Sequence, residues 1–220
     1  MIRVVPDPAL AAAEALAAAL GAALATGSGP VGLVLSGGRT PLRVLPPLLA
    51  QDLDWGRVRG MAGDERLVPP DHPASTEGLV AGLFAAAGRP LSYHGVGPDP
   101  APAAALAHWR RGWAALPPVA AAFLGLGPDG HTVSLFPGRP EAADQSLMTA
   151  FVPETPPHAH ARLTLGPAAL AALPRLVLVA EGAEKRAVLA RALAPDADPA
   201  LLPVAWVARL PQALILQDGA

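Results

Sequence analysis

An Asp–Gly–His triplet at Asp129–His131 is the stretch of this 220-residue chain best suited to acid–base chemistry. Histidine is the side chain whose unperturbed pKa lies nearest neutrality, and a neighbouring carboxylate can orient its ring. The triplet follows an apolar run at 119–124 and glycines that permit tight turns. The pattern predicts an acid–base site with His131 at the carboxyl end of a strand, and a turn aspartate with a hydrogen-bonded histidine is the alternative. Asp129 either takes part in the proton transfer or only holds the turn.

A second group of candidate residues lies between an apolar run at 31–35 and a helix predicted to begin at Pro41. Its glycines let backbone amides face an anion, the helix N-terminus adds partial positive charge, and hydroxyls can donate to phosphate oxygens. It does not match the GxxxxGK[ST] loop of nucleoside triphosphate sites. The segment fits either a phosphate cradle or an ordinary strand-to-helix turn. The candidate residues are Ser36, Gly37, Gly38, Arg39 and Thr40.

Charged residues stand at the ends of other predicted elements. Asp64, Glu65 and Arg66 follow a strand predicted at 58–62, and a solvated charge cluster at a loop is the alternative for them. Arg162 begins a short predicted strand. Lys185 lies near the start of a predicted helix, where a cation is unfavourable against the helix dipole unless an anion is close. Glu181 and Glu184 could instead neutralise that lysine.

Metal and covalent chemistry find little support in the sequence. The chain has no cysteine, no HExxH pattern and no third ligand at helpful spacing from Asp129 and His131. His158 and His160 form a His-x-His pair that could bind metal, although a solvated loop is the favoured interpretation. No serine stands in a G-x-S-x-G elbow, so water activated by a base is simpler than an acyl-enzyme. We expect no metal and no cofactor.

Apolar runs alternate with helical patterns along the chain, which predicts a doubly wound, mainly parallel α/β sheet with helices on both faces. No linker divides it, so residues 1–220 are expected to form one domain. Strands are predicted at 2–5, 31–35, 58–62, 92–96, 119–125, 162–165, 176–180, 204–207 and 213–216. Helices are predicted at 8–25, from 41 onward, and at 74–87, 101–115, 167–173 and 182–193. The segment 141–155 has no clear periodicity.

Composition limits the partners. A net charge of −2 and a pI near 6.3 do not favour a polyanion-binding surface, so no nucleic-acid partner is expected. The alanine-rich stretch 9–25 contains Glu14 and lacks a basic leader, which favours a soluble helix over a signal peptide or membrane span. The absence of cysteine fits a reducing cytoplasm. A cytoplasmic protein, with a monomer favoured, is the expectation.

Five stretches together resemble the 6-phosphogluconolactonase family, in the order in which that family has them. They are LSGGRTP at 35–41, GDERLVPPDHPAS at 63–75, FLGLGPDGHTVSLFPG at 123–138, RLTL at 162–165 and EGAEKRAVL at 181–189. The continuation of Asp–Gly–His into Ser–Leu–Phe–Pro–Gly is the specific part. Related glucosamine-6-phosphate deaminases share the triplet but usually continue toward Asn–Glu–Pro.

The resemblance implies hydrolysis of 6-phospho-D-glucono-1,5-lactone, a small phosphorylated sugar lactone, in the oxidative pentose phosphate pathway. It implies His131 as the base, assisted by Asp129, and Arg66 facing the lactone or its oxyanion. Phosphate would lie on Gly37, Gly38, Arg39 and Thr40, with Arg162 and Lys185 closing over it. Ser36, Asp64 and Ser75 complete the expected substrate-binding set.

The chain departs from the family at two places. Thr76–Glu77 stands where the family commonly has Asn–Tyr, and Arg39 replaces a small or hydroxyl residue. Arg39 either adds a phosphate contact or faces solvent. The alternatives to a lactonase are a sugar-phosphate deaminase or isomerase with Asp64 as its base, and a non-catalytic sugar-phosphate sensor. The sensor is disfavoured because such proteins usually carry a DNA-binding helix-turn-helix, for which 220 residues leave no room.

Overall fold

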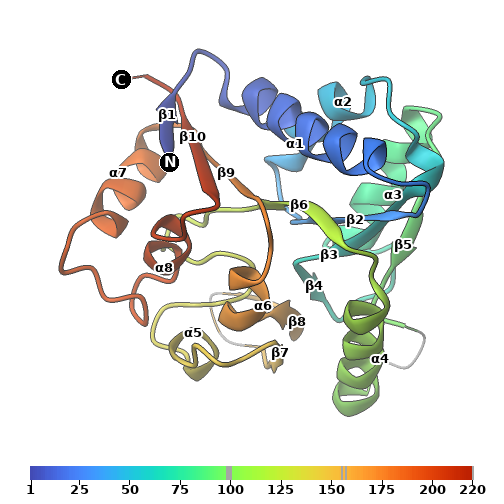
Figure 1. Ribbon diagram of the computed structural model, residues 1–220. Helices are drawn as coiled ribbons and strands as arrows, with labels where there is room; N and C mark the ends of the chain where they lie inside the picture. The colour runs from blue at the N-terminus through green and yellow to red at the C-terminus, as the bar shows by residue number, and fades with distance from the viewer. Residues whose placement is uncertain (98–100, 155, 157, 220) are drawn as a thin grey trace.

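The computed structural model describes residues 1–97, 101–154, 156 and 158–219. Within these residues a seven-stranded parallel sheet runs through the molecule in the order β1-β10-β9-β6-β2-β3-β5 (Figure 1). Its strands are β1 (Ile2–Val4), β2 (Val31–Leu35), β3 (Val58–Ala62), β5 (Ser92–His94), β6 (Val119–Leu124), β9 (Leu176–Ala180) and β10 (Ala213–Gln217). The predicted fold class is confirmed.

Helices cover both faces of this sheet (Figure 1). They are α1 (Pro8–Ala25), α2 (Pro41–Leu49), α3 (Thr76–Ala86), α4 (Pro102–Ala115), α5 (Pro140–Ala143), α6 (Pro167–Ala171), α7 (Ala183–Ala192) and α8 (Val204–Ala208), with a 3₁₀ turn at Trp55–Arg57. Proline stands in the first turn of several of them, where its missing N–H costs nothing.

A small antiparallel sheet adds to the predicted architecture. It consists of β4 (Asp64–Arg66), β8 (Arg162–Leu165) and β7 (Thr149–Val152), with β8 in the middle. The strand predicted at 162–165 therefore exists but lies outside the main sheet. The charged β4 has no apolar alternation to reveal it, and β7 falls in the segment whose periodicity was unclear. Thr155, at the end of that segment, lies outside the described residues.

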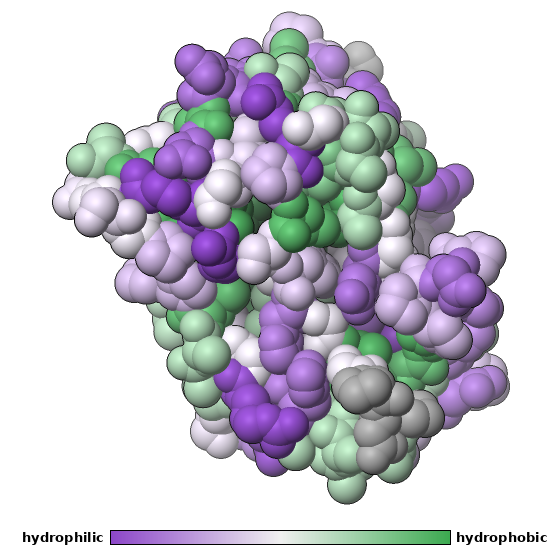
Figure 2. Space-filling view, turned by 90° about the vertical axis from the view of Figure 1, so that its right-hand side faces the viewer, coloured by the Kyte–Doolittle hydropathy of each residue, from purple (hydrophilic) through white to green (hydrophobic). Residues whose placement is uncertain are grey.

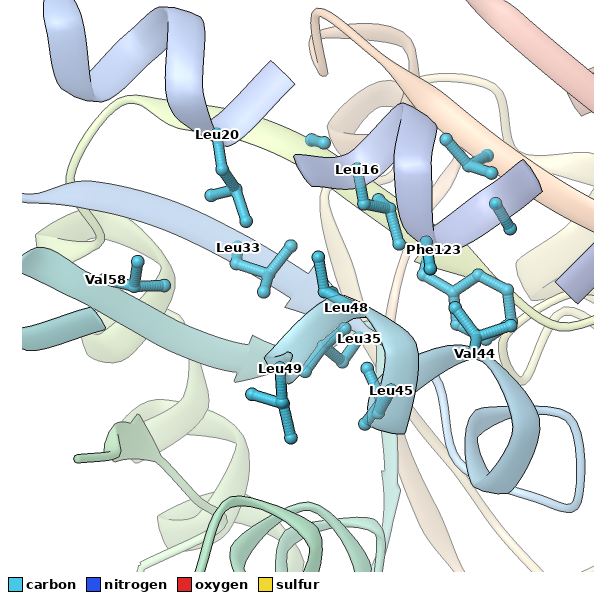
Figure 3. Packing of buried hydrophobic residues seen from close by; sticks show 14 of the residues in the cluster. Leu16, Leu20, Leu33, Leu35, Val44, Leu45, Leu48, Leu49, Val58 and Phe123 are labelled. Carbon is cyan, nitrogen blue, oxygen red and sulfur yellow. The ribbon is translucent and has the colours of Figure 1, made fainter. Parts of the chain in front are cut away.

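The main sheet is buried on both faces, as parallel sheets usually are. Alternate residues of each strand point to opposite sides. On one side, Leu33 and Leu35 of β2 and Phe123 of β6 pack against Leu16 and Leu20 of α1 and a leucine-rich face of α2 (Figure 3). On the other side, strand residues such as Val34 and Leu124 pack with α6, α7 and α8.

Helix α1 is a core element. It is long and apolar enough, by length and composition, to cross a membrane. However, Ala12, Ala13, Leu16 and Leu20 are fully buried beneath it, in the same cluster as the central strands. At about 25 cal/mol per Å² of apolar surface, four such side chains contribute several kcal/mol to folding. Asp7 caps its first turn by accepting the backbone N–H groups of Ala9 and Leu10.

The strand predicted at 204–207 is wrong, because these residues form helix α8. A short apolar run does not distinguish a buried helical turn from a strand, and Val204, Ala205 and Val207 are buried on all sides. Pro203 precedes the helix with helical dihedrals, and the Val204 N–H donates to Gly130 O at 3.0 Å. Helix α8 thus supports the turn that carries the Asp–Gly–His triplet.

Among the described residues, the large apolar side chains that are exposed lie on several elements. Met1, Ile2 and Val4 lie together at the edge strand β1, whereas others, such as Leu42 and Leu201, lie elsewhere. On the face that carries α3, β5 and α4, hydrophilic residues are interspersed with apolar groups (Figure 2). Exposed apolar residues in small numbers are normal for a folded chain.

Candidate active site

The site lies where the chain direction across the main sheet reverses. From β2 the chain proceeds to β3 on one side, whereas from β6 it proceeds to β9 on the other, although β2 and β6 are neighbours. Loops leaving two such strands diverge and open a crevice at their carboxyl ends, which is where ligands bind in open α/β sheets. A cleft of about 180 Å³ occupies this position.

Most of the predicted site residues line this cleft. Its wall contains Ser36, Gly37, Gly38, Arg39, Thr40, Asp64, Arg66, His131, Arg162 and Lys185, together with Gly125–Pro128 and Val133. Residues separated by as many as 149 positions in sequence, Ser36 and Lys185, therefore meet at one place. Asp129 and Ser75 do not line it. Asp129 lies behind His131, and Ser75 is buried at the start of α3.

The turn after β2 forms the first wall of the cleft. Gly38 has a φ of +92°, in the left-handed region where a Cβ would be strained. Thr40 precedes Pro41 at the start of α2, as predicted, but its hydroxyl makes no capping bond. It instead accepts a hydrogen bond from Lys185 Nζ at 3.2 Å, which joins the turn to α7. Arg39 lies beside them and is exposed.

Positive charge is concentrated on this wall. Burial lowers the pKa of Lys185, and the nearby Arg39 guanidinium lowers it further, while Glu181 and Glu184 act in the opposite direction. Two cations brought together beside backbone amides at a helix N-terminus are stabilised when an anion binds between them. The predicted neutralising role of Glu181 is partly taken elsewhere, since its carboxylate pairs with Arg43.

The second wall comes from the small antiparallel sheet. Asp64 and Arg66 are two apart in β4, so both face the cleft while Glu65 points away. Asp64 accepts a hydrogen bond from Ser134 Oγ at 2.6 Å and pairs with Arg162 Nη1 at 3.7 Å. Asp64 and Arg162 are 6% and 7% exposed. Burial lowers the pKa of Arg162, and the Asp64 carboxylate opposes that shift.

Glu65 anchors the second wall from behind. It is 1% exposed and accepts the backbone N–H groups of Arg66, Thr76 and Glu77 at 2.6–2.8 Å. Burial raises the pKa of this carboxyl, and the three N–H donors oppose the shift. A solvated charge cluster was the alternative for this stretch, and for Glu65 it is wrong. Thr76 and Glu77 begin α3, and Ser75 caps this helix by accepting the Gly78 N–H at 3.0 Å.

His131 and Asp129 form a hydrogen-bonded pair at the end of β6. His131 Nδ1 lies 2.5 Å from Asp129 Oδ1, which also accepts the His131 backbone N–H at 3.1 Å. Because a carboxylate only accepts, Nδ1 carries the proton and Nε2 is left with a lone pair. Burial acts to raise the pKa of Asp129, but its hydrogen bonds to His131 and His158 outweigh burial and hold it well below its usual value.

The loop beyond His131 ties the two sheets together. Thr132 Oγ1 donates to Gly125 O at the end of β6, whereas the Ser134 N–H donates to Thr164 Oγ1 of β8 at 3.1 Å. Between them, Val133 has a φ of +47°, which is strained for a β-branched residue. Such strain costs about 1–3 kcal/mol and persists where neighbouring contacts enforce it. The strained turn fixes His131 relative to Asp64 and Arg162.

His158 completes the surroundings of Asp129. Its Nε2 lies 3.2 Å from Asp129 Oδ2, and its ring stacks on Phe136 with centroids 4.1 Å apart. The His158 side chain is 25% exposed, so it is partly solvated, as predicted, but is also held within the site. His160 contacts the ring of His72 instead. The ligand atoms of Asp129, His131 and His158 lie within 4.8 Å of one another, so these three side chains could hold a metal ion. The sequence pattern paired His158 with His160 and did not indicate this grouping with Asp129 and His131.

Comparison with known proteins agrees with this arrangement. The family model for glucosamine-6-phosphate isomerases/6-phosphogluconolactonase matches residues 7–215. A 6-phosphogluconolactonase of Caulobacter vibrioides is 38% identical over 93% of this chain and 89% of its own length. Another from Pseudomonas aeruginosa is 37% identical over 81% of this chain and 78% of its own.

Solved structures give the same result for the fold. The chain resembles a 6-phosphogluconolactonase from Shewanella baltica with a TM-score of 0.87 and 26% identity, over 100% of this chain and 97% of that one. A 6-phosphogluconolactonase from Thermotoga maritima gives a TM-score of 0.82 and 27% identity, over 100% and 99%. The resemblance found in the sequence is confirmed: the chain belongs to the glucosamine-6-phosphate isomerase/6-phosphogluconolactonase family.

Proposed function

We propose that this protein hydrolyses 6-phospho-D-glucono-1,5-lactone to 6-phospho-D-gluconate. This is the reaction for which its 6-phosphogluconolactonase relatives are named. One observation carries the proposal. The His131–Asp129 pair opens onto the same cleft as the cations Arg39, Arg162 and Lys185. A base that can activate water and a site for a phosphoryl dianion are the two things that hydrolysis of a phosphorylated lactone requires.

In the proposed reaction His131 Nε2 takes a proton from water as its oxygen attacks the lactone carbonyl. Asp129 keeps the other ring nitrogen protonated and favours the imidazolium that forms. Arg66, with backbone N–H groups at the end of β6, stabilises the negative charge that develops on the carbonyl oxygen. The bond between the carbonyl carbon and the ring oxygen then breaks. The imidazolium returns its proton to this leaving oxygen, which becomes a hydroxyl group. Every atom of the reaction comes from the lactone and water, so no cofactor is needed.

The phosphate group is assigned to the first wall. Backbone amides of Gly37 and Gly38, the Thr40 hydroxyl and the side chains of Arg39 and Lys185 lie together there. Arg162 would close the site from the second wall, as predicted. Ser36 has a buried hydroxyl without a partner among the described residues, which suits it to a substrate contact. Ser75 already serves as a helix cap, so its direct contact with substrate stays a prediction.

Asp64 bears on the deaminase alternative. Both contacts of Asp64 are made by one carboxylate oxygen, Oδ2, which accepts from Ser134 and pairs with Arg162. They suit a carboxylate that positions Arg162, and an ammonia-release assay decides on the deaminase alternative. The location of the protein and its monomeric state stay predictions from the sequence.

The test is a lactonase assay at controlled pH, because the lactone also opens spontaneously in water. We expect rates that exceed the spontaneous rate in proportion to enzyme, a lower kcat/KM for unphosphorylated glucono-1,5-lactone, and no ammonia from glucosamine 6-phosphate. Ammonia release would favour the deaminase. Stabilisation of the fold by 6-phosphogluconate without turnover would favour a sensor, and either outcome would refute the proposal.

A further inference from the structure

His158 is a partner of the catalytic pair that the proposed chemistry has not used. It reaches Asp129 Oδ2 at 3.2 Å, whereas His131 holds the other oxygen, Oδ1, at 2.5 Å. The carboxylate is therefore shared between two imidazoles, one on each oxygen. We infer that His158 is a positioning residue, which donates its Nε2–H to Asp129 and thereby fixes the carboxylate that orients the base. The inference rests on the proposed function.

The position of the His158 ring is set by packing. It stacks on Phe136 at an interplanar angle of 19°, and the His131 ring meets its edge with centroids 5.3 Å apart. Phe136 also contacts His131, at 5.0 Å, and lies beneath the Arg162 guanidinium. A single aromatic side chain thus supports both histidines. The His158 side chain is 25% exposed, so its ring is held rather than free to rotate in water.

Geometry assigns the proton of this contact. A carboxylate oxygen only accepts, so the His158 nitrogen that faces Asp129 Oδ2 is the one that carries hydrogen. His158 Nε2 therefore donates to Oδ2 in the same way as His131 Nδ1 donates to Oδ1.

His158 is needed to fix the second oxygen of the Asp129 carboxylate, Oδ2. Asp129 Oδ1 already accepts the side-chain and backbone N–H groups of His131, and His158 is the partner of Oδ2 among the described residues. Without it, Oδ2 loses the hydrogen bond to His158 and can bind water instead, so the carboxylate gains freedom to rotate.

The test replaces His158 with Phe and with Gln. His158→Phe keeps the stacking on Phe136 but lacks a donor, whereas the terminal amide of His158→Gln can reach Asp129 Oδ2 without titrating. We expect kcat of His158→Phe to fall by about tenfold with KM little changed, since hydrogen bonds to charged groups are of this order. His158→Gln should recover kcat to within about twofold of the parent protein.

His160→Asn is the matched control, because His160 lies two residues away but contacts His72 and has a φ of +69°, which asparagine tolerates. All assays are run both with and without EDTA, so that an effect caused by a metal ion held by Asp129, His131 and His158 can be recognised. Unchanged kcat in His158→Phe, or a loss as large in His158→Gln, would overturn the inference. So would an effect that vanishes when EDTA is present.

A second readout does not depend on the substrate. The proton between His131 Nδ1 and Asp129 should give a downfield NMR resonance whose shift changes in His158→Phe and returns toward the parent value in His158→Gln. A resonance that stays in place would refute the positioning role. If this readout behaves as expected but the parent protein does not hydrolyse the lactone, the proposed function fails and the positioning of His131 by His158 stands.

Discussion

The two walls of the cleft carry similar charges in very different surroundings. The first wall, called the open wall below, consists of Arg39, Thr40 and Lys185, and its Arg39 is exposed to solvent. The second wall, called the buried wall below, consists of Asp64, Arg66 and Arg162. Asp64 and Arg162 are almost entirely removed from solvent. On the open wall one hydrogen bond joins Lys185 to Thr40. The buried wall is held by Ser134, Glu65 and the pairing of β4 with β8.

This difference determines what each charge does. Removal of the exposed charge of Arg39 costs little stability. Removal of the partly buried charge of Lys185 relieves its desolvation. Both changes mainly weaken attraction for an anion. A buried charge depends on its partner, because desolvation is unfavourable unless the partner is present. We therefore expect the open wall to tolerate substitution at the expense of substrate binding. Substitution in the buried wall should affect folding as well.

His131 lies between the two walls and should give the largest change in activity. His131→Ala is expected to lower kcat by about 10²–10⁴-fold, the usual contribution of a general base, with KM little altered. Neither wall loses a contact, since the hydrogen bonds of His131 that the structure describes are to Asp129 and Gly127. Steady-state kinetics with subtraction of the spontaneous rate measure the effect.

The control for His131→Ala is His108→Ala, which removes a histidine of α4 that stacks on His94 outside the cleft. It should retain the kcat of the parent protein. Circular dichroism should show both variants folded. A His131→Ala protein with the parental rate would remove His131 from the role of base.

Breaking the buried wall should give the next largest effect, and mainly on stability. Asp64→Asn leaves the Arg162 guanidinium without its carboxylate. Removing one partner of a buried ion pair typically costs about 3–5 kcal/mol, and the 3.7 Å separation places this pair near the lower end. Urea unfolding monitored by tryptophan fluorescence should show a lower free energy of unfolding.

A double-mutant cycle with Arg162→Met separates the ion pair from other effects of the substitution. The double variant removes both charges, so it should be more stable than the sum of the two single changes predicts. Additive losses would mean that Asp64 and Arg162 do not stabilise each other. The proposed difference between the two walls would then be wrong for its most buried pair.

The main sheet could be predicted because its strands carry their own signal. Runs such as Val31–Leu35 and Leu176–Ala180 are apolar on both faces, as buried parallel strands must be. Strand β4 could not be predicted in this way. Its residues Asp64–Arg66 are charged, and they form a strand because β8 pairs with them, nearly one hundred residues later in the chain.

The same distinction applies to the site. The turn of the open wall can be predicted locally, because the glycines, the hydroxyls and the helix start within Ser36–Pro41 indicate an anion-binding site. Asp129 and His131 are likewise neighbours in sequence. The roles of Glu65 and His158 depend on distant partners: Thr76 and Glu77 for the first, Asp129 and Phe136 for the second. A charge or a histidine with such partners looks the same in sequence as one that faces solvent.

Lys185 on the open wall should give the smallest effect, confined to binding. Lys185→Met keeps most of the side-chain volume but removes the charge. We expect KM for the phosphorylated lactone to rise about tenfold, equivalent to about 1.4 kcal/mol, with kcat nearly unchanged. The urea midpoint should not fall, because burial already disfavours the charged form of Lys185, as its lowered pKa shows.

The unphosphorylated lactone and an exposed cation provide the comparisons for this variant. Arg111→Met removes a charge of α4 outside the cleft and should leave KM unchanged. Lys185→Met should act on glucono-1,5-lactone as efficiently as the parent protein does, because that substrate has no phosphate for Lys185 to contact. An equal loss with both lactones would mean that Lys185 supports the geometry of the site, and the open wall would then resemble the buried one.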